Sequence, residues 1–345
     1  MKIIVLTAGL GTRLRPHTLT RPKALLKVAG RPVLAYILDK LMELETRARD
    51  LEFIFVNGWL GEQIVAYVEQ EYVQSGKIRA HFVEQVQPLG QAHAIGLAHD
   101  LVLAQGDDPE VLVVFGDTIF DTDFLALNKL PTEVAGALFV NEVEDPRRFG
   151  VAVIDPTNGY VKQVVEKPAE PISKLAICSP YYFKSARQLL GAIEKVIQSG
   201  RQTKGEYFLA DAIAQMLEAG ALLQPLPMPI WLDAGTFQAM LETNRALLEI
   251  HQVTIKPLRA VNASVILLEP VWIDTDVIIE RSVIGPHVAI SKGAVIQDSV
   301  VADSIIEEGS QLNGVSVRHT LVGRFTKING PAAFTGLNLG DYSEI

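Results

Sequence analysis

The sequence predicts an α/β fold, a mostly parallel sheet with helices on both faces, followed by a parallel β-helix. Two observations support this prediction. Up to about residue 250, short apolar runs alternate with segments of helical periodicity, and apolar strands between helices are typical of a parallel sheet that is covered on both faces. From about Ala263, small and branched apolar residues recur every six residues, which is typical of stacked β-helix coils.

The strands and helices of the first part follow from this alternation. We expect strands at residues 2–6, 52–56, 78–82, 111–115, 136–140, 151–154 and 175–177. We expect helices at residues 33–44, 61–72, 90–103, 186–199, 207–219 and 237–251. Ligands of such sheets bind at the carboxyl ends of the strands, so the residues that follow each strand are the candidate functional residues.

The β-helix is predicted from two columns of residues with a six-residue period. Positions 271, 277, 283, 289, 295 and 301 are Val, Val, Val, Ala, Val and Val, and the next positions are Trp, Ile, Ile, Ile, Ile and Ala. Glycine and proline at residues 285–286 and glycine at 293 fit the corners between short strands. We therefore expect one domain at residues 1–250 and a second part at 251–345, with a linker at 252–262 before the β-helix.

The composition excludes several classes of protein. The chain has 345 residues, of which 48% are hydrophobic and 21% are charged, and its formal net charge is −9. No apolar stretch reaches the length of a membrane span, and the apolar run that starts the chain is too short for a signal peptide. Cys178 is the single cysteine, so an intrachain disulfide is excluded. With no basic tract, we expect a cytoplasmic protein with neither a nucleic-acid nor a membrane partner.

The loop after the first predicted strand is the most informative motif. It reads LTAGLGTRL at residues 6–14 and is followed by RPK at residues 21–23. Glycines that end a strand expose backbone N–H groups, and these bind phosphate. Residues 1–38 contain seven Lys and Arg and no Asp or Glu. This local positive charge in an acidic chain predicts an anionic small molecule, and the loop predicts a polyphosphate.

Two other nucleotide-binding designs do not fit the loop. A dinucleotide-binding fingerprint needs a third glycine where this chain has Leu14, and an acidic residue about 20 positions later, whereas the first acidic residue is Asp39. The P-loop string, in which glycine precedes Lys and Ser or Thr, does not occur in the sequence. Instead Arg13 and Lys23 supply fixed positive charge.

Two aspartates are candidates for a metal site. Asp117 follows the predicted strand at 111–115, and Asp233 precedes the predicted helix at 237–251. Each alone fits a turn or an N-cap equally well. Beside a polyphosphate loop, however, two carboxylates match the habit of Mg²⁺, which takes one or two carboxylates together with phosphate oxygens.

Further candidates lie at the ends of other strands. Gln85 carries both a donor and an acceptor, as a base edge requires, but it fits a surface turn as well. Glu166 and Lys167 suit the hydroxyls and phosphate of a sugar phosphate, with an exposed ion pair as the alternative. Gly150 offers backbone without a side chain, which suits either close approach of a ligand or a simple turn.

These motifs occur in the order found in sugar-1-phosphate nucleotidylyltransferases. The chain resembles this family, most of all the long form of the glucose-1-phosphate thymidylyltransferases, which carries a C-terminal β-helix. The motifs that carry the resemblance lie at residues 6–14, 21–23, 88–90, 116–117, 149–151, 166–168 and 231–236. The resemblance implies a Rossmann-like first domain and a left-handed β-helix. One departure concerns the sugar site, because relatives often have Gly-x-Tyr where this chain has Ser179-Pro180-Tyr181.

The resemblance also implies a role for each matching position. Arg13, Lys23, Asp117 and Asp233 would be catalytic, with Asp117 and Asp233 holding Mg²⁺. Sugar phosphate would be bound by four residues, namely Gly150, Glu166, Lys167 and Tyr181. The nucleotide would be bound by Leu6, Ala8, Gly9, Gly11, Thr12, Arg13, Gln85, Pro88 and Gly90.

The implied reaction joins an NTP and a sugar 1-phosphate to give an NDP-sugar and pyrophosphate. dTTP and glucose 1-phosphate are the expected substrates. GTP with mannose 1-phosphate, or UTP with glucose 1-phosphate, are alternatives that share every phosphate motif. A non-catalytic regulatory subunit should have lost Arg13, Lys23 or an aspartate, and all are present. A second, acyltransferase activity would need a catalytic histidine in the repeats, where His287 fits a coil corner better. We also expect a homo-oligomer.

Overall fold

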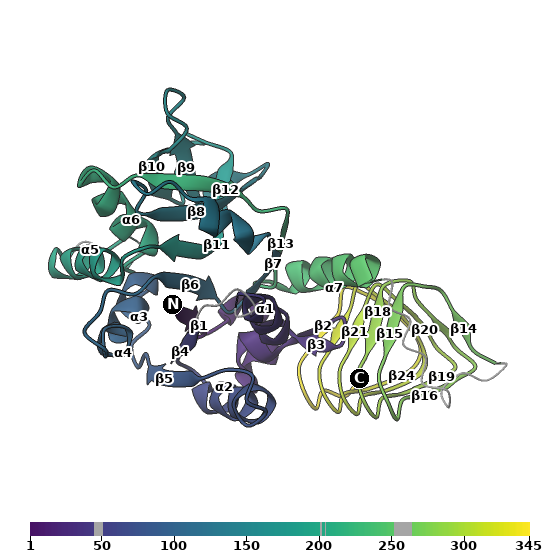
Figure 1. Ribbon diagram of the computed structural model, residues 1–345. Coiled ribbons are helices and arrows are strands. Elements are labelled where there is room, and N and C mark those ends of the chain that lie inside the picture. Colours follow the sequence, from purple (N-terminus) through teal and green to yellow (C-terminus); the bar gives the residue numbers. More distant parts are fainter. Residues whose placement is uncertain (45–50, 201, 204, 252–263) are drawn as a thin grey trace. The chain divides into compact units, whose positions relative to one another are not determined.

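The computed structural model describes residues 1–44, 51–200, 202–203, 205–251 and 264–345. The predicted linker at residues 252–262 lies outside these ranges. The chain divides into two compact units that are not contiguous in sequence: unit 1 is Met1–Gly9 with Ile37–Trp231, and unit 2 is Leu10–Tyr36 with Leu232–Ile345. Figure 1 shows the elements of both units, and each unit is described in turn. Within the described residues, no helix has the length and apolarity that a membrane span requires.

Unit 1 contains a nine-stranded sheet with the order β10-β9-β11-β6-β1-β4-β5, in which β8 pairs with β11 and β12 with β8. The strands are β1 (Lys2–Leu6), β4 (Glu52–Asn57), β5 (Ala80–Glu84), β6 (Val111–Phe115), β8 (Gly136–Glu142), β9 (Gly150–Ile154), β10 (Val161–Glu166), β11 (Leu175–Phe183) and β12 (Leu223–Pro227). A separate two-stranded sheet pairs β7 (Thr118–Asp121) with β13 (Ile230–Asp233). The boundary between the two units falls within β13.

The sheet has a parallel part and an antiparallel part. β6, β1, β4 and β5 are parallel, and successive residues of β1, Ile3 and Ile4, are both fully buried, so both faces of this part are covered. β11 runs antiparallel to β6, β8 and β9, and β9 runs antiparallel to β10. The expected parallel sheet is therefore confirmed around β1. The far strands form antiparallel pairs, except that β12 runs parallel to β8.

Helices of unit 1 cover the sheet. The α-helices are α1 (Val33–Met42, of which residues 33–36 belong to unit 2), α2 (Gly61–Val68), α3 (Gln91–Leu97), α4 (His99–Val102), α5 (Ala186–Gln198) and α6 (Leu209–Glu218). A π-helical turn, Glu69–Val73, follows α2, and short 3-10 helices lie at Phe124–Lys129 and Pro146–Arg148. Side chains of α3, α5 and α6 form one buried cluster with β1, β4, β6 and β11.

The predicted elements of unit 1 are recovered with shifts at their ends. β1 and β6 have the predicted bounds, and β5 begins two residues later than expected. The helix expected at residues 90–103 is divided into α3 and α4 at Ala98. The strands β7, β10, β12 and β13 were not expected, because polar residues or prolines interrupt their short apolar runs.

Unit 2 combines the segment at residues 10–36 with α7 (Phe237–His251) and the β-helix. The segment holds three short 3-10 helices, η1 (Thr12–Leu14), η2 (His17–Leu19) and η3 (Lys23–Leu25), and a hairpin of β2 (Lys27–Val28) and β3 (Arg31–Pro32). Ala29 and Gly30 form the hairpin turn with φ of 43° and 81°. Two successive residues with positive φ are typical of a type I′ turn.

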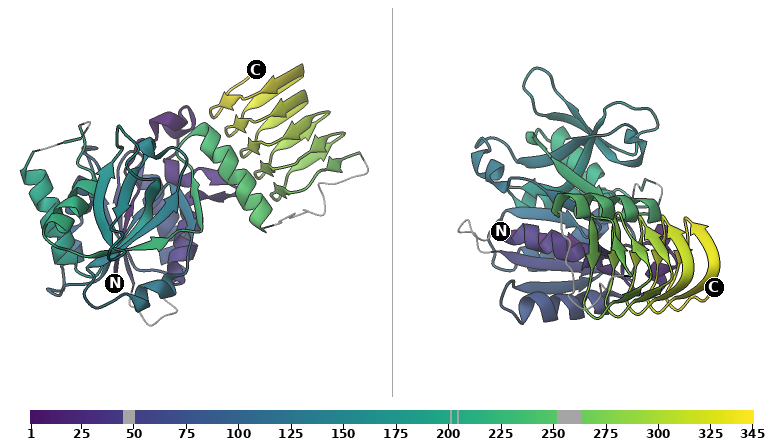
Figure 2. Two further views of the ribbon diagram at one scale, coloured as in Figure 1. Left: turned by 90° about the horizontal axis from the view of Figure 1, so that it is seen from above. Right: turned by 90° about the vertical axis from the view of Figure 1, so that its right-hand side faces the viewer.

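The β-helix consists of parallel coils, which Figure 2 shows stacked on one another. One sheet has the order β14-β17-β20-β22-β19-β16, with β24 paired to β22, and the other has the order β15-β18-β21-β23-β25. The strands are β14 (Ile266–Leu267), β15 (Val271–Ile273), β16 (Ile278–Glu280), β17 (Val283–Ile284), β18 (Val288–Ile290), β19 (Val295–Gln297), β20 (Val300–Ala302), β21 (Ile305–Ile306), β22 (Gln311–Arg318), β23 (Leu321–Val322), β24 (Lys327–Thr335) and β25 (Asn338–Leu339).

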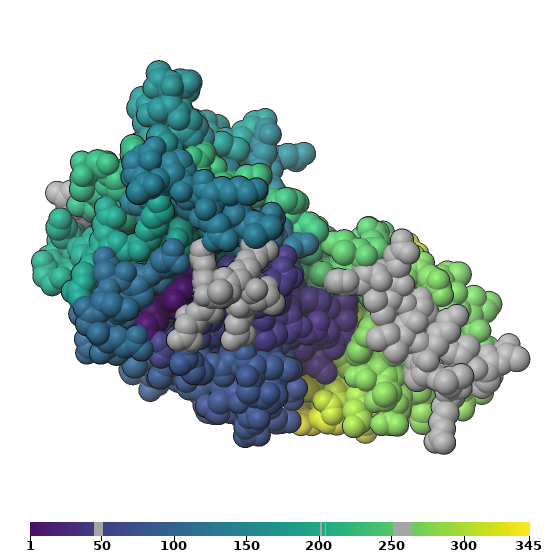
Figure 3. Space-filling model, viewed as in Figure 1, coloured from purple at the N-terminus to yellow at the C-terminus, as the bar shows by residue number. Residues whose placement is uncertain are grey.

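Each coil of the β-helix contains fewer residues than three hexapeptides. Paired positions of successive coils lie 17 residues apart, as Ile266 and Val283 do, or 16 residues apart, as Ala289 and Ile305 do. One side of each coil is therefore shorter than six residues, and the buried column drifts out of the strict six-residue register. Ile278, expected in a regular column, is half exposed as a result. The parallel coils themselves are as predicted and are consistent with a left-handed β-helix. Figure 3 shows the surface that the side chains form, with the β-helix in green to yellow.

Candidate functional site

The strand order places the first loop and Asp117 at one edge of the parallel sheet in unit 1. Leu6 is paired with Phe115 of β6 and Val56 of β4. The ladder continues past these strands, because Gly116 N donates to Leu6 O at 2.9 Å and Thr7 N donates to Val56 O at 2.9 Å. The chain that leads to Ala8 and Gly9 therefore starts beside the Gly116–Asp117 turn, as the sequence predicted for the carboxyl ends of parallel strands.

The first loop is held tightly where it leaves the sheet. Thr7 Oγ1 donates to Asn57 Oδ1 at 2.6 Å, and a Cβ at Gly58 would lie 2.6 Å from Ala8 O. The loop backbone thus lies directly on the end of β4, while Gly9 is exposed. An exposed glycine backbone above fixed strands suits contact with a phosphate.

In unit 2, the second glycine of the loop packs against the lysine of the RPK motif. Gly11 has φ of 61°, and a Cβ on it would lie 2.8 Å from Thr18 Cγ2 and 3.3 Å from Lys23 Cβ. Thr18, which is buried, donates from Oγ1 to Gly11 O at 2.8 Å. Thr18 was not predicted from the sequence, although a hydroxyl seven residues after Gly11 can bind the backbone of the loop. Thr12 and Arg13 are exposed on the 3-10 turn that follows Gly11.

Lys23 and Asp233, 210 positions apart, come together in unit 2. A Cβ placed on Gly235 would lie 3.1 Å from Lys23 Nζ and 2.8 Å from Asp233 Oδ1. Asp233 is held in turn, because its Oδ1 accepts a hydrogen bond from Gly235 N at 2.9 Å and its carbonyl accepts one from Thr243 Oγ1 at 2.6 Å. A cation and a carboxylate at one glycine turn match the charges that a metal-bound polyphosphate needs.

The predicted base-reading turn of unit 1 is internally braced. Gln85 is buried, and its Nε2 donates to Gly90 O at 3.0 Å and lies 3.0 Å from His93 Nδ1. Burial lowers the pKa of His93, which favours a neutral ring that accepts this bond. Both amide hydrogens of Gln85 thus hold the turn, so a base would meet its Oε1 alone. Pro88 is exposed on the same turn.

Gly90 could not be replaced without moving its neighbours. Its φ is 102°, and a Cβ would lie 2.6 Å from Tyr207 O. The backbone of Tyr207 also binds both sides of this turn, since its N donates to Leu89 O at 2.8 Å and its O accepts from Ala92 N at 2.9 Å. The glycine is therefore needed for close packing as well as for any contact with a nucleotide.

The four predicted sugar-phosphate residues come together in unit 1. Gly150 of β9 is paired with Glu166 of β10, and a Cβ on Gly150 would lie 2.8 Å from Glu166 Oε2. Glu166 Oε1 lies 3.1 Å from Lys167 Nζ. That ammonium also lies 4.4 Å from the centre of the Phe208 ring, a contact that the sequence did not indicate.

The pKa of Tyr181 is affected both by Glu166 and by Asp117. Burial raises the pKa of Tyr181 well above its ordinary value, and the carboxylates of Glu166 and Asp117 raise it further, so its hydroxyl stays protonated near both. Burial also raises the pKa of Glu166, against the opposing charge of Lys167. A buried carboxylate beside an ammonium and a phenol can accept sugar hydroxyls, while the ammonium can meet a phosphate.

Ser179-Pro180-Tyr181, the segment that departs from the family pattern, is part of strand β11. Ser179 Oγ accepts a hydrogen bond from Phe115 N at 2.8 Å, at a point where the pairing of β11 with β8 shifts between Cys178 and Tyr181. The serine hydroxyl thus replaces a ladder acceptor at this bulge. Tyr181 then packs its ring 5.4 Å from that of Phe115.

The predicted site residues fall into both units. Asp117 and the sugar-phosphate group belong to unit 1, whereas Arg13, Lys23 and Asp233 belong to unit 2. A shared site for Asp117 and Asp233 therefore stays a prediction. In the ranges that the structure describes, no cluster of three or more His, Cys, Asp or Glu side chains is arranged around a common metal position.

Comparisons of the sequence and the fold with known proteins identify the family of the chain. The sequence profile of the nucleotidyl transferase family matches residues 2–250. The chain is 31% identical to a glucose-1-phosphate thymidylyltransferase of Streptomyces antibioticus, covering 100% of this chain and 99% of that protein. It is 33% identical to a UTP–glucose-1-phosphate uridylyltransferase of Haloferax volcanii, over 68% of this chain and 91% of that one. It also resembles a crystal structure from Bacillus anthracis assigned as a glucose-1-phosphate thymidylyltransferase and bound to a sucrose. The TM-score is 0.59 at 27% identity, covering 74% of this chain and 97% of that chain.

Proposed function

Because the chain belongs to the nucleotidyl transferase family, we propose that this sugar-1-phosphate nucleotidylyltransferase converts dTTP and glucose 1-phosphate into dTDP-glucose and pyrophosphate. The observation that carries the choice of substrates is the match to a thymidylyltransferase over the full chain, β-helix included. The uridylyltransferase match covers only 68% of the chain. We propose that residues 1–250 form the catalytic domain and that residues 251–345 form the linker and the β-helix.

The chemistry requires positioning more than proton transfer. A non-bridging oxygen of the sugar phosphate attacks the α-phosphorus of the nucleotide, a P–O bond forms, and the bond from the α-phosphorus to the bridging oxygen breaks. Pyrophosphate leaves with that electron pair. The attacking phosphate is already an anion, so the residues have to align the reactants and neutralise charge. We assign the charge on the triphosphate to Arg13 and Lys23.

The two other groups of residues hold the substrates. We propose that Gly9 and Gly11 bind phosphate through backbone N–H groups, with Leu6, Ala8 and Thr12 shaping the same loop. Gln85, Pro88 and Gly90 would bound the base. Lys167 would bind the phosphate of the sugar substrate, Glu166 would accept hydrogen bonds from sugar hydroxyls, and Tyr181 and Gly150 would border the sugar. The 3.1 Å pair of Glu166 and Lys167 supports this division, because it pre-orients both groups.

Enzymes of this family generally use a divalent metal ion, and the carboxylates here suit Mg²⁺. Asp117 and Asp233 supply the one or two carboxylate ligands that Mg²⁺ takes alongside phosphate oxygens. Lys23 Nζ beside Asp233 fits this use, because the ammonium and the ion would meet neighbouring phosphate oxygens. The ion would neutralise charge on the triphosphate. We therefore propose Mg²⁺ as the cofactor.

The test combines a substrate panel with two variants. Pyrophosphate release is measured with dTTP, UTP, GTP and ATP against glucose 1-phosphate and mannose 1-phosphate. We expect the highest kcat/KM with dTTP and glucose 1-phosphate, and a preference for GTP with mannose 1-phosphate would contradict the proposal. Arg13→Ala should lower kcat roughly 10³-fold, as loss of positioned cations does in phosphoryl transfer, and Asp117→Asn should abolish release. Turnover like that of the wild type in either variant would remove that assignment.

A homo-oligomer, a cytoplasmic location and the lack of a nucleic-acid partner, all expected from the sequence, stay predictions. Light scattering of the purified protein measures the first directly. A mass equal to that of one chain at working concentrations would contradict it.

A further inference from the structure

The β-helix packs on the segment that carries the predicted triphosphate-binding residues, and both belong to unit 2. The family reaction explains why Arg13 and Lys23 lie on this segment, but it assigns nothing to the coils beneath it. Contacts reach the segment from the first, third and last coils, and from the second coil through Asn244 of α7. They fall into two groups, one at the hairpin turn and one at Arg21.

The hairpin turn is seated on the first coil and on α7. A Cβ on Gly30 would lie 2.1 Å from the Trp272 ring of β15, so the turn backbone rests against the indole. Asn244 of α7 accepts from Ala29 N at 2.8 Å and donates to His287 O at 3.1 Å. This buried amide therefore joins the turn to the second coil.

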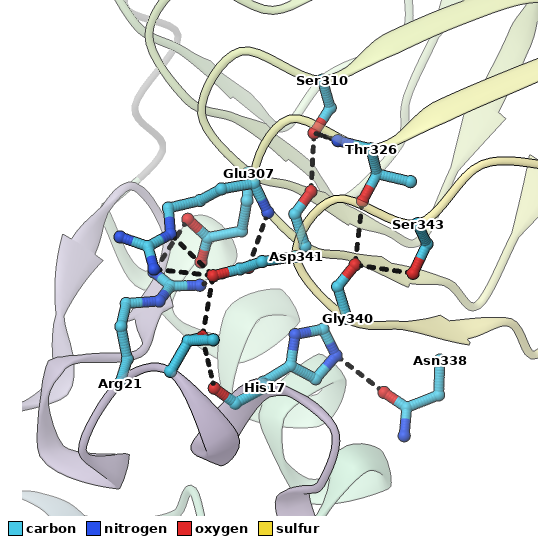
Figure 4. A network of polar contacts seen from close by, with 12 residues as sticks. His17, Arg21, Glu307, Ser310, Thr326, Asn338, Gly340, Asp341 and Ser343 are labelled. Carbon is cyan, nitrogen blue, oxygen red and sulfur yellow. Dashed lines mark hydrogen bonds and ion pairs between the residues drawn. The ribbon is translucent and has the colours of Figure 1, made fainter. Parts of the chain in front are cut away.

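Arg21 lies in a group of four charges, of which Figure 4 shows Arg21, Glu307 and Asp341. Its Nη1 donates to Glu307 Oε2 at 3.1 Å, and its Nη2 lies 3.7 Å from Asp341 Oδ1. Arg324 binds Asp341 as well, with Nη2 and Nε at 2.6 and 2.9 Å from Oδ2. The side chains of Arg21, Glu307 and Asp341 are 7%, 2% and 1% exposed.

The carboxylates of this group come from one corner of the β-helix. Glu307 follows β21 and Asp341 follows β25, strands that are stacked through β23 in the same sheet. Gly323 lies between them at this corner, and a Cβ there would be 2.5 Å from Asp341 N. The coils are thus shaped so that two acidic side chains from different turns of the helix reach one guanidinium.

Smaller contacts extend the same interface. His17 Nε2 lies 2.8 Å from Asn338 Oδ1, and Asn338 Nδ2 donates to Arg15 O at 3.1 Å. Thr20 Oγ1 donates to Asp341 Oδ2 at 2.8 Å. Burial alone would raise the pKa of Asp341, but hydrogen bonds from Arg324 and Thr20 and the charge of Arg21 lower it overall, so the carboxylate stays ionised.

A shift of Arg21 would pass directly to Lys23. The two residues are separated by Pro22 alone, whose ring fixes its φ, and Leu25 N and Leu26 N close the short helix on Pro22 O and Lys23 O. Lys23 also packs close to Gly11, since a Cβ on Gly11 would lie 3.3 Å from Lys23 Cβ. Gly11 in turn directly precedes the 3-10 turn that carries Arg13. Arg21 is therefore coupled to both predicted triphosphate ligands by short, stiff connections.

We propose that Glu307 and Asp341 are positioning residues for nucleotidyl transfer, which act through Arg21 to hold Lys23 and the loop of Arg13 in place for the triphosphate. This inference rests on the proposed role of Arg13 and Lys23. It gives the β-helix a function in the reaction itself. The group of charges belongs to unit 2 together with Arg13 and Lys23, whereas the sugar-phosphate residues belong to unit 1. We therefore expect the effect on the nucleotide.

The experiment uses the full chain with Glu307→Gln and Asp341→Asn, and steady-state pyrophosphate release with each substrate varied. Both variants keep the side-chain shape and remove one buried charge. We expect kcat/KM for the nucleotide to fall about 10- to 100-fold, the scale of a misplacement near 1 Å, while KM for sugar 1-phosphate stays within about twofold. A purely structural role would lower the active fraction without raising KM for the nucleotide alone.

The matched control is Asp298→Asn, which removes another carboxylate of the β-helix. Asp298 binds Arg281 through both oxygens, at 2.6 and 2.8 Å, on an exposed edge of the coils. This control should keep the kinetics of the wild type. If Glu307→Gln and Asp341→Asn fold and keep the nucleotide KM of this control, the proposal is wrong.

Two further variants keep the result interpretable. If the charge-removing variants do not fold, Thr20→Val removes the bond to Asp341 at an exposed position, and we expect a two- to fivefold rise in the nucleotide KM, whereas no change overturns the inference. Lys23→Ala separates the two proposals. Full activity of Lys23→Ala would refute the triphosphate assignment, whereas loss of activity there with normal Glu307→Gln kinetics would refute only the role of the β-helix.

Discussion

Replacing Gly11 by alanine perturbs the predicted phosphate loop at one atom. The backbone there has φ of 61°, and the added Cβ would lie 2.8 Å from Thr18 Cγ2 and 3.3 Å from Lys23 Cβ. A left-handed conformation costs an alanine roughly 1–2 kcal/mol. Carbon atoms prefer separations of about 3.5–4.0 Å, so Thr18 or the loop has to move by about 1 Å. Displacements of this size near reacting groups cost about 100-fold in rate.

The control for this variant is Gly293→Ala in the same unit. Gly293 has φ of 69° and nothing within 4 Å of its Cβ position, so it carries the backbone cost without the contact. We expect Gly293→Ala to lower the free energy of unfolding by about 1–2 kcal/mol, and Gly11→Ala to lower it by at least as much because of the added contact, both measured by denaturant titration. Gly11→Ala alone should lower kcat/KM for the nucleotide, by about 10- to 100-fold, in a pyrophosphate-release assay. Equal kinetics for the two variants would refute the view that Gly11 shapes the triphosphate site.

Two further predictions concern the metal and acid pH. Removing divalent cations with EDTA should stop pyrophosphate release and added Mg²⁺ should restore it, whereas full activity in EDTA would contradict a metal requirement. Burial lowers the pKa of His17 below its ordinary 6.5, so the unfolded chain binds a proton that the folded chain does not. Stability from this group is therefore present above pH 6.5 and is lost as the pH falls towards the lowered value. The wild type should lose stability relative to His17→Gln over this range, and a constant difference between them would show that His17 does not titrate as inferred.

Periodicity and apolar runs were enough to predict the parallel part of unit 1 and the presence of the β-helix. Residues 3–6 and 111–115 are continuous apolar runs of the length of a buried strand, and the bounds predicted for these two strands, 2–6 and 111–115, are confirmed. The length of each coil could not be predicted in this way. Five- and six-residue sides both place an apolar residue inside, so the sequence does not distinguish a coil of 16 or 17 residues from one of 18.

The sequence also did not indicate which segment packs on the coils. Residues 10–36 follow the first strand and were expected to stay with its sheet, but they belong to unit 2. Glu307 and Asp341 look like ordinary polar corner residues of a repeat, since corners usually face solvent. In the structure their side chains are 2% and 1% exposed, and Arg21, which they bind, lies 286 positions from Glu307. Contacts over such distances in sequence leave no local pattern from which to predict them.

Glu166 allows a test that separates a binding role from a structural one. Its carboxylate is buried, and this burial raises its pKa despite Lys167 at 3.1 Å. Between the unfolded pKa near 4.5 and the raised folded value, the folded chain binds more protons than the unfolded chain. The ionised form therefore costs stability, and this cost is complete above the folded pKa and disappears as the pH falls towards 4.5.

Glu166→Gln removes that cost while it keeps the shape of the side chain. We expect the variant to be more stable than the wild type at neutral pH, with a difference that vanishes near pH 4.5, in denaturant titrations across this range. The same variant should lower kcat/KM for sugar 1-phosphate by roughly 10- to 100-fold, the value of one charge-assisted hydrogen bond, because a charged acceptor for the sugar hydroxyls is lost. An ion pair with Lys167 kept only for stability demands the reverse, a less stable variant with normal kinetics. A side chain that lowers the stability of the free protein but raises its turnover is one that binds substrate. The stability and kinetics of Glu166→Gln together therefore decide whether Glu166 binds substrate or only stabilises the fold.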